Sequence, residues 1–329
     1  MPKNKELSTQ GPRRLTSFLL STPLLLSLLG LFLSGCGPVP PVDPFYLGEA
    51  KSNLSRGNHW YQVGCYQEAN RFFEASLISA RLSDNVLYIV MSLNAQGATY
   101  LALKDLPKAA QVLNEAIELT TAEPTQPELP ALLGNMGTLA YLAGRFDDAR
   151  DFWRRAADVS VERGQSAGTY LSNLARMEYE EGNSAEFERN LELAKLTLTD
   201  ELTPKAARSD ILNLAALQSM DRGDLSGALT LLEEATEIDR ELENQAGLAQ
   251  DLETRYVIHQ REGNHALAAQ SLSRAFYLRA SLGDTKALKK DLGLLRESSK
   301  AHGHPENLAP FEAIAKKPAL FDPLKEYCP

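Results

Sequence analysis

The sequence is poor in the residues that build metal sites, disulfide frameworks and sugar-binding surfaces. Its 329 residues include three cysteines and five histidines, and aromatic residues make up 7%. No His-Glu-x-x-His motif, phosphate-binding glycine loop or nucleophile elbow is present. The shortage of aromatic rings also argues against a groove that stacks on glycans. We therefore predict no catalytic residues, no metal site and no cofactor.

Positive charge is scarce as well. The chain has 34 basic and 43 acidic side chains, and residues 1–35 hold four of the basic ones and one acidic one. Residues 36–329 alone carry a net charge of −12. An acidic surface repels phosphate backbones and anionic lipid. We therefore expect no nucleic-acid partner, and a membrane attachment would have to come from something other than a basic patch.

The N-terminus offers such an attachment. Arg13 and Arg14 precede residues 15–33, a run without any charge. The run ends in an aliphatic residue, two small residues and a cysteine, Leu33-Ser34-Gly35-Cys36. This motif resembles the lipobox of bacterial lipoprotein signal peptides. The resemblance implies that residues 1–35 are a signal peptide that is removed, and that Cys36 becomes a first residue carrying acyl chains such as palmitate.

Residues 15–33 could instead form an uncleaved transmembrane helix, because 19 uncharged residues nearly span a bilayer. Pro23 argues against this alternative. In lipoproteins, the residue after the lipidated cysteine influences sorting between membranes, and Gly37 favours the outer one. The resemblance therefore implies the bacterial cell envelope, at the periplasmic face of the outer membrane if the cell has one.

A proline-rich segment follows the cysteine. Four of the eight residues from Gly37 to Pro44 are proline, which prevents a helix and favours extended polyproline II. At about 3.1 Å per residue, the stretch is on the order of 25 Å long. We interpret residues 36–46 as the lipidated cysteine and a tether, and helical periodicity begins at about residue 47.

A short phrase recurs along the helical region: a glycine with a polar residue, two variable residues, and a small residue that opens an apolar helix. The best copies are Gly64–Ala69, Gly144–Ala149, Gly223–Ala228 and Gly263–Ala268, with weaker copies that end at Ala109 and Phe187. The last residues of the six copies stand at 69, 109, 149, 187, 228 and 268. So regular a period predicts stacked helix hairpins over residues 47–283.

The second helix of each copy carries the same pattern. A large apolar residue follows the phrase after four positions and a small residue after three more, as in Trp153 and Ala156. These spacings place both residues on one helix face, where a small side chain lets two backbones approach closely. The glycine permits the positive φ that ends the first helix.

The resemblance to the tetratricopeptide repeat family is strongest over residues 90–160. The matching residues are Leu93, Gly97, Tyr100, Ala109, Leu113, Ala116, Leu133, Gly137, Gly144, Phe146, Ala149, Trp153 and Ala156. The resemblance implies an all-α fold, a right-handed solenoid of about six hairpins whose concave groove is lined by the first helices. We expect a capping helix over residues 284–303 and a proline-rich tail over residues 304–329.

The match to this family is incomplete. The period here is about 40 residues, against about 34 in the family. Phe187 and Tyr256 stand where the pattern has small residues. We therefore expect the late repeats to pack with altered curvature.

Asparagine recurs once in each of five first helices: Asn53, Asn94, Asn135, Asn173 and Asn213. In tetratricopeptide proteins that bind extended peptides, such amides line the groove and clasp the ligand backbone, since an amide both donates and accepts. The resemblance makes the last four candidate peptide-binding residues, together with Tyr141 and Tyr179. The alternatives are that the asparagines satisfy turns and that the tyrosines pack in the core.

The sequence thus favours a non-enzymatic, membrane-anchored interaction module: an adaptor, assembly factor or scaffold that binds a protein segment. The alternative is an envelope enzyme or transport component that uses the tail after residue 303. Cys65 and Cys328 could form a disulfide in an exported protein. They lie at opposite ends of the array in sequence, so the tail would have to fold back along it, and the sequence disfavours this bridge.

Overall fold

A computed structural model describes residues 43–122, 128–302, 308–318 and Cys328. The predicted signal peptide (1–35) and the predicted lipidation site Cys36 lie outside this part of the chain. Every regular element within these ranges is a helix, and none of these helices is long and apolar enough to cross a membrane. The prediction of an all-α fold is confirmed.

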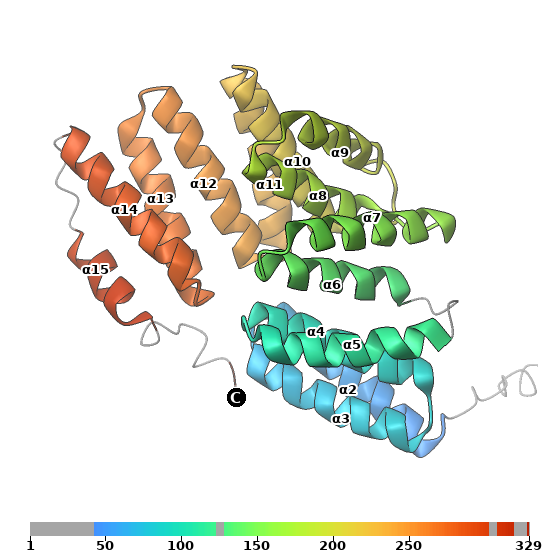
Figure 1. The fold of residues 1–329 in the computed structure, drawn as a ribbon. Coiled ribbons are helices and arrows are strands. Elements are labelled where there is room, and N and C mark those ends of the chain that lie inside the picture. The colour runs from blue at the N-terminus through green and yellow to red at the C-terminus, as the bar shows by residue number, and fades with distance from the viewer. Residues whose placement is uncertain (1–42, 123–127, 303–307, 319–327, 329) are drawn as a thin grey trace, which may run out of the picture. The chain divides into compact units, whose positions relative to one another are not determined.

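Twelve of the helices pair into six consecutive hairpins (Figure 1). The pairs are α2 (Phe45–Gln62) with α3 (Tyr66–Leu82), α4 (Val86–Ala102) with α5 (Leu106–Ala122), α6 (Leu129–Leu142) with α7 (Phe146–Glu162), α8 (Gly168–Glu181) with α9 (Ser184–Leu196), α10 (Lys205–Asp221) with α11 (Leu225–Glu241), and α12 (Gln245–Arg261) with α13 (His265–Ser281). The two helices of each hairpin pack on each other, and each hairpin packs on the next one, as in a helical repeat solenoid.

The turn inside each hairpin requires a left-handed residue. Gly144, which follows α6, has φ 74°, and the glycines of four other copies do the same. In the second repeat Lys104 takes this place at φ 60°. A side chain tolerates that conformation only at a cost, which explains why glycine dominates the repeat phrase.

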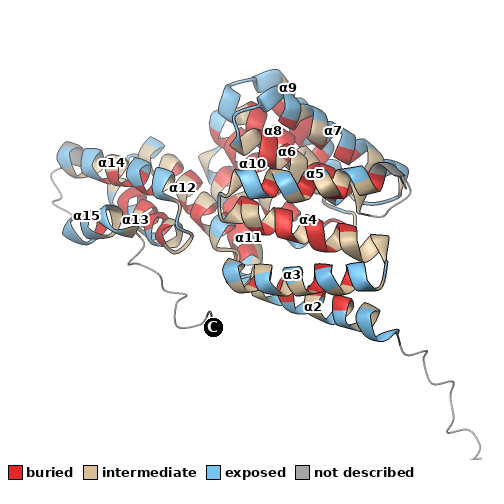
Figure 2. Ribbon diagram, turned by 60° about the horizontal axis from the view of Figure 1, so that its bottom comes forward, coloured by how far each residue is buried: buried red, intermediate tan, exposed pale blue. Residues whose placement is uncertain are grey.

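The two helices of a hairpin interlock through one matched pair of residues sixteen positions apart. In the first three repeats a glycine of the first helix faces a large residue of the second, namely Gly57 with Phe73, Gly97 with Leu113, and Gly137 with Trp153. A Cβ added at Gly137 would lie 2.5 Å from the Trp153 ring. The indole also donates a 3.1 Å hydrogen bond to the Gly134 carbonyl. Figure 2 shows buried segments alternating with exposed ones along the helices.

Two further helices follow the sixth hairpin. α14 (Thr285–His302) buries Leu288, Leu292 and Leu295. α15 (Ala309–Lys316) places Phe311 edge-on against Phe276 of α13, with ring centroids 5.1 Å apart. The described part of the tail therefore covers the apolar end of the array.

The structure joins Cys65 and Cys328 by a disulfide, with 5.4 Å between their Cα atoms. The sequence-based expectation that these residues stay apart is thus wrong. It treated separation along the array as distance in space. The array is curved enough that Tyr61 of α2 and Gln250 of α12 line one cavity, so its ends are not remote from each other.

Candidate functional site

The first helices surround a cavity of about 530 Å³, which we call the central cavity. Its walls come mainly from α4, α6 and α8, and the side chains of Tyr61 and Gln250 reach it from α2 and α12. Leu101, Leu142 and Met177 provide apolar surface, while amides and charged groups stand among them. A concave site of this size with a few polar groups is typical of ligand-binding pockets.

The four candidate asparagines divide into two pairs. Asn135 and Asn173 line the central cavity. Asn94 is buried and accepts a 2.7 Å hydrogen bond from the Asn135 amide. Asn213 is buried and donates to Asp251 at 2.8 Å. The amides of Asn94 and Asn213 are therefore engaged within the protein.

The repeat register explains this division. Asn135 and Asn173 stand two residues before Gly137 and Ala175, the small residues of their first helices. Asn94 and Asn213 stand three residues before theirs. One residue turns a helix by about 100°, so the first pair points into the cavity and the second into the contact between repeats. No described residue forms a hydrogen bond with the Asn173 side chain, and its amide is available to a ligand.

The two candidate tyrosines lie in different surroundings. Tyr141 lines the central cavity and donates a hydrogen bond to Glu180, which is part of the same wall. Burial, followed by that carboxylate, raises the pKa of Tyr141, so the phenol keeps its proton. Tyr179 instead packs edge-on against Phe187, with centroids 5.1 Å apart. Tyr179 is partly buried and packs against the core cluster that contains Phe187.

Sequence reasoning missed Arg176, the main cation of the cavity wall. Its guanidinium donates to Asn213 at 3.0 Å, and the Gln250 amide accepts from it when the amide oxygen faces the guanidinium. Burial lowers the pKa of Arg176, and the carboxylates of Asp210 and Glu180 oppose that shift. Arginine stays charged under such conditions.

Helical spacing could have identified this residue. Arg176 lies three positions after Asn173, on the same helix face. The equivalent positions in the second and third repeats are Ala98 and Thr138, and both line the cavity. Asparagine recurs from repeat to repeat and is therefore visible in the sequence, whereas this inward-facing position changes residue type from repeat to repeat.

The chain matches no family model. No curated protein matches it either. Among solved structures it is similar to BtubC (BKLC) from P. vanneervenii at 21% identity, covering 73% of this chain and 93% of that one with a TM-score of 0.43. It is also similar to the TPR2AB domain of yeast Sti1 in a complex with pHSP90, at 13% identity, covering 77% and 99% with a TM-score of 0.30.

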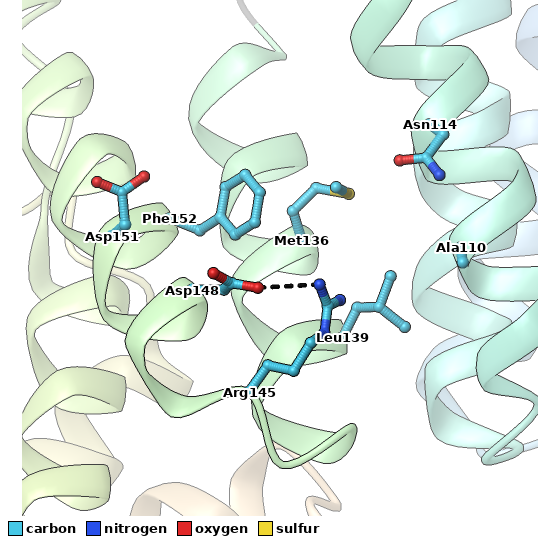
Figure 3. A pocket seen from close by; sticks show the side chains of 8 residues that line it. All are labelled: Ala110, Asn114, Met136, Leu139, Arg145, Asp148, Asp151 and Phe152. Atoms are coloured by element: carbon cyan, nitrogen blue, oxygen red, sulfur yellow. Dashed lines mark hydrogen bonds and ion pairs between the residues drawn. The ribbon is translucent and has the colours of Figure 1, made fainter.

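A second cavity, of about 300 Å³, lies between the second helices α5 and α7 (Figure 3). Met136 and Phe152 form apolar surface there, and Arg145 pairs with Asp148 at 2.9 Å across its rim. None of the predicted site residues lines it. Among the residues that the structure describes, no group of three or more His, Cys, Asp or Glu side chains could hold a metal ion.

Carboxylates are buried next to the central cavity. Asp251 accepts from Asn213 at 2.8 Å and from Thr236 at 3.0 Å. Burial nevertheless raises its pKa to about 7, and burial raises the pKa of Asp210 to about 6. Both groups ionise less readily than in water, because the folded protein solvates the charge less well than water does.

The raised pKa of Asp251 predicts a stability that depends on pH. Its folded-state pKa exceeds the unfolded value, so the folded protein binds more protons between about pH 4 and pH 7. Stability should therefore fall as the pH rises through 7, by about 2–3 kcal/mol between pH 5 and pH 8 from this group alone. Asp251→Asn should flatten the profile and raise stability at pH 8. Urea titrations at several pH values would test this, and a steeper profile in the variant would contradict it.

Proposed function

We propose that this protein is a non-enzymatic adaptor that binds a short segment of a partner protein in the central cavity. The observation that supports this most directly is the pair Asn135 and Asn173, two amides that line one concave site. Each can donate to a peptide carbonyl and accept from a peptide N–H. Helical repeats present such concave surfaces for recognition.

The wall of the cavity fits a peptide better than a small polar metabolite. Leu101, Leu142 and Met177 offer apolar surface for one or two side chains. Tyr141 adds a ring face, and its hydroxyl is already committed to Glu180. Because the volume is about 530 Å³, recognition would concern a few residues of the partner rather than a long stretch.

Replacing both Asn135 and Asn173 with alanine should weaken partner binding at least tenfold, while the free energy of unfolding falls only by the cost of leaving the Asn94 oxygen unpaired, about 1–3 kcal/mol. Each lost amide removes hydrogen bonds worth on the order of 1 kcal/mol, and about 1.4 kcal/mol is a factor of ten in affinity. Affinity would be measured by calorimetry with a partner peptide recovered by crosslinking from envelope extracts.

The matched control for this test is Asn114→Ala, which alters the second cavity instead. An equal loss of affinity in the control would place binding on the second helices. A large drop in melting temperature of the double variant, with unchanged affinity of the folded fraction, would show that the asparagines serve packing.

We further propose that Cys36 anchors this adaptor in the bacterial envelope through covalent lipid. The support is the lipobox-like motif at the end of an uncharged run, followed by a proline-rich tether. More than one acyl chain is needed for stable attachment, since a single chain binds only marginally. Gly37 favours the outer membrane as the destination.

Cys36→Ser should abolish acylation and leave the precursor unprocessed or the protein soluble. Cells would be labelled with an alkyne fatty acid, and the protein would then be isolated and tagged. The wild-type protein should carry label and the variant none. An unlabelled wild-type protein would rule out the lipoprotein assignment and leave the cavity hypothesis untouched.

A further inference from the structure

Most of the exposed large hydrophobic residues share one position in the repeat, and those of the first four repeats lie on one side of the array (Figure 1). We define the return edge as the side where each second helix ends and the next hairpin begins. All the described large hydrophobics with high exposure lie on this edge, except Phe146 and Leu267. Each of them is in the last five residues of a second helix, in the segment just after it, or at the start of α2.

The most exposed members are aliphatic. Leu196 is 75% exposed, Val161 68%, Leu202 66% and Leu82 59%. They belong to the first four repeats, whose second helices end on the same side of the array (Figure 1). In Figure 1 the ends of α3 and α7 lie on the side where α2 starts. Apolar side chains collected in this way mark an interaction surface.

The chain enters the array at this same edge. Phe45, 73% exposed, and Tyr46 open α2 there, and only eight residues separate Phe45 from Cys36. An extended tether of that length spans on the order of 25 Å. A lipid anchor at Cys36 would therefore keep the return edge close to the bilayer and leave the opposite edge farther from it.

We propose that the return edge rests on the lipid bilayer surface, with its aliphatic and aromatic side chains in the interface. This proposal rests on the lipid anchor at Cys36. Aromatic and aliphatic side chains partition favourably into that layer. Two cations of the edge are already paired with carboxylates, Arg81 with Glu115 and Lys205 with Glu241. We therefore expect contact with zwitterionic lipid in preference to anionic lipid.

Photocrosslinking in vesicles of phosphatidylcholine would test this contact. A benzophenone amino acid would replace Leu196 or Leu202 on the return edge, or Leu267 as the exposed leucine of the other edge. The acylated protein should yield at least tenfold more lipid adduct from positions 196 and 202 than from position 267. Equal yields, or adducts mainly to a second protein molecule, would overturn the proposal.

A second arm separates this contact from lipidation. A hexahistidine tag would replace residues 1–36, so that nickel-chelating lipid holds the chain at the same point without any acylation. Residues 44–329 form one compact unit, which this chain retains. The triple variant Leu82→Ser, Leu196→Ser and Leu202→Ser should cut lipid adducts from a benzophenone at position 161 at least fivefold. An unchanged yield would refute the return-edge contact even if acylation were proven.

Discussion

Replacing Trp153 with alanine should lower the free energy of unfolding by about 3–5 kcal/mol. The indole is 4% exposed and packs against Gly137. Its loss leaves a cavity that a glycine cannot fill, and it removes the hydrogen bond to the Gly134 carbonyl. Because repeat energetics are local, hydrogen exchange should rise first in α6 and α7. Chemical denaturation would measure the change, and a loss below about 0.5 kcal/mol would contradict the repeat register.

The partner glycine provides the reciprocal test. Gly137→Ala places a Cβ 2.5 Å from the ring and should cost about 1–3 kcal/mol. Adding Trp153→Leu recreates the Ala175–Leu191 and Ala216–Leu232 pairs of later repeats. The double variant should therefore be more stable than the sum of the single losses predicts. Strict additivity would show that the two residues do not constrain each other.

Removing the Cys65–Cys328 disulfide should produce the other large effect. Its two cysteines are 263 positions apart. In the chain-entropy model, closing so long a loop lowers the conformational entropy of the unfolded chain and so raises the free energy of unfolding by up to about 5 kcal/mol. Cys328→Ser should lower the melting temperature of the oxidised protein and increase hydrogen exchange in α2, α3 and α15. Differential scanning calorimetry with and without reductant would quantify the loss.

The control for this experiment is the variant in which both cysteines are serine. It should match Cys328→Ser, since either change alone breaks the bond. Reductant should have no effect on it. If the wild-type protein melted at the same temperature with and without reductant, the disulfide would contribute nothing to stability.

The repeat architecture could be predicted because it depends on local patterns. The phrase that ends at Ala149 fixes a turn, and Trp153 and Ala156 fix the buried face of the following helix. The same spacing located all six hairpins. Asn135 and Asn173, two of the asparagines that the resemblance singled out, share a register and line the central cavity.

The remaining features depend on how small rotations between repeats add up. Arg176 of α8 meets Gln250 of α12, two hairpins further on, and Cys65 meets Cys328. No spacing in the sequence encodes these contacts, since each requires the curvature of the whole array. The position of Tyr179 on its helix is compatible with a side chain in the cavity or in the core. In the structure its ring packs against Phe187.

The sixteen-residue pairing between the two helices of a hairpin bears on how such an array can evolve. A duplication that copies a whole hairpin keeps Gly137 with Trp153, or Ala175 with Leu191, and each copy packs as its parent did. A crossover within the turn could instead join Ala175 to a tryptophan, which overfills the contact. Exchange of a complete hairpin avoids this mismatch. The array can therefore lengthen or shorten by whole repeats, whereas a helix exchanged alone can lose the residue that matches it in the other helix of its hairpin.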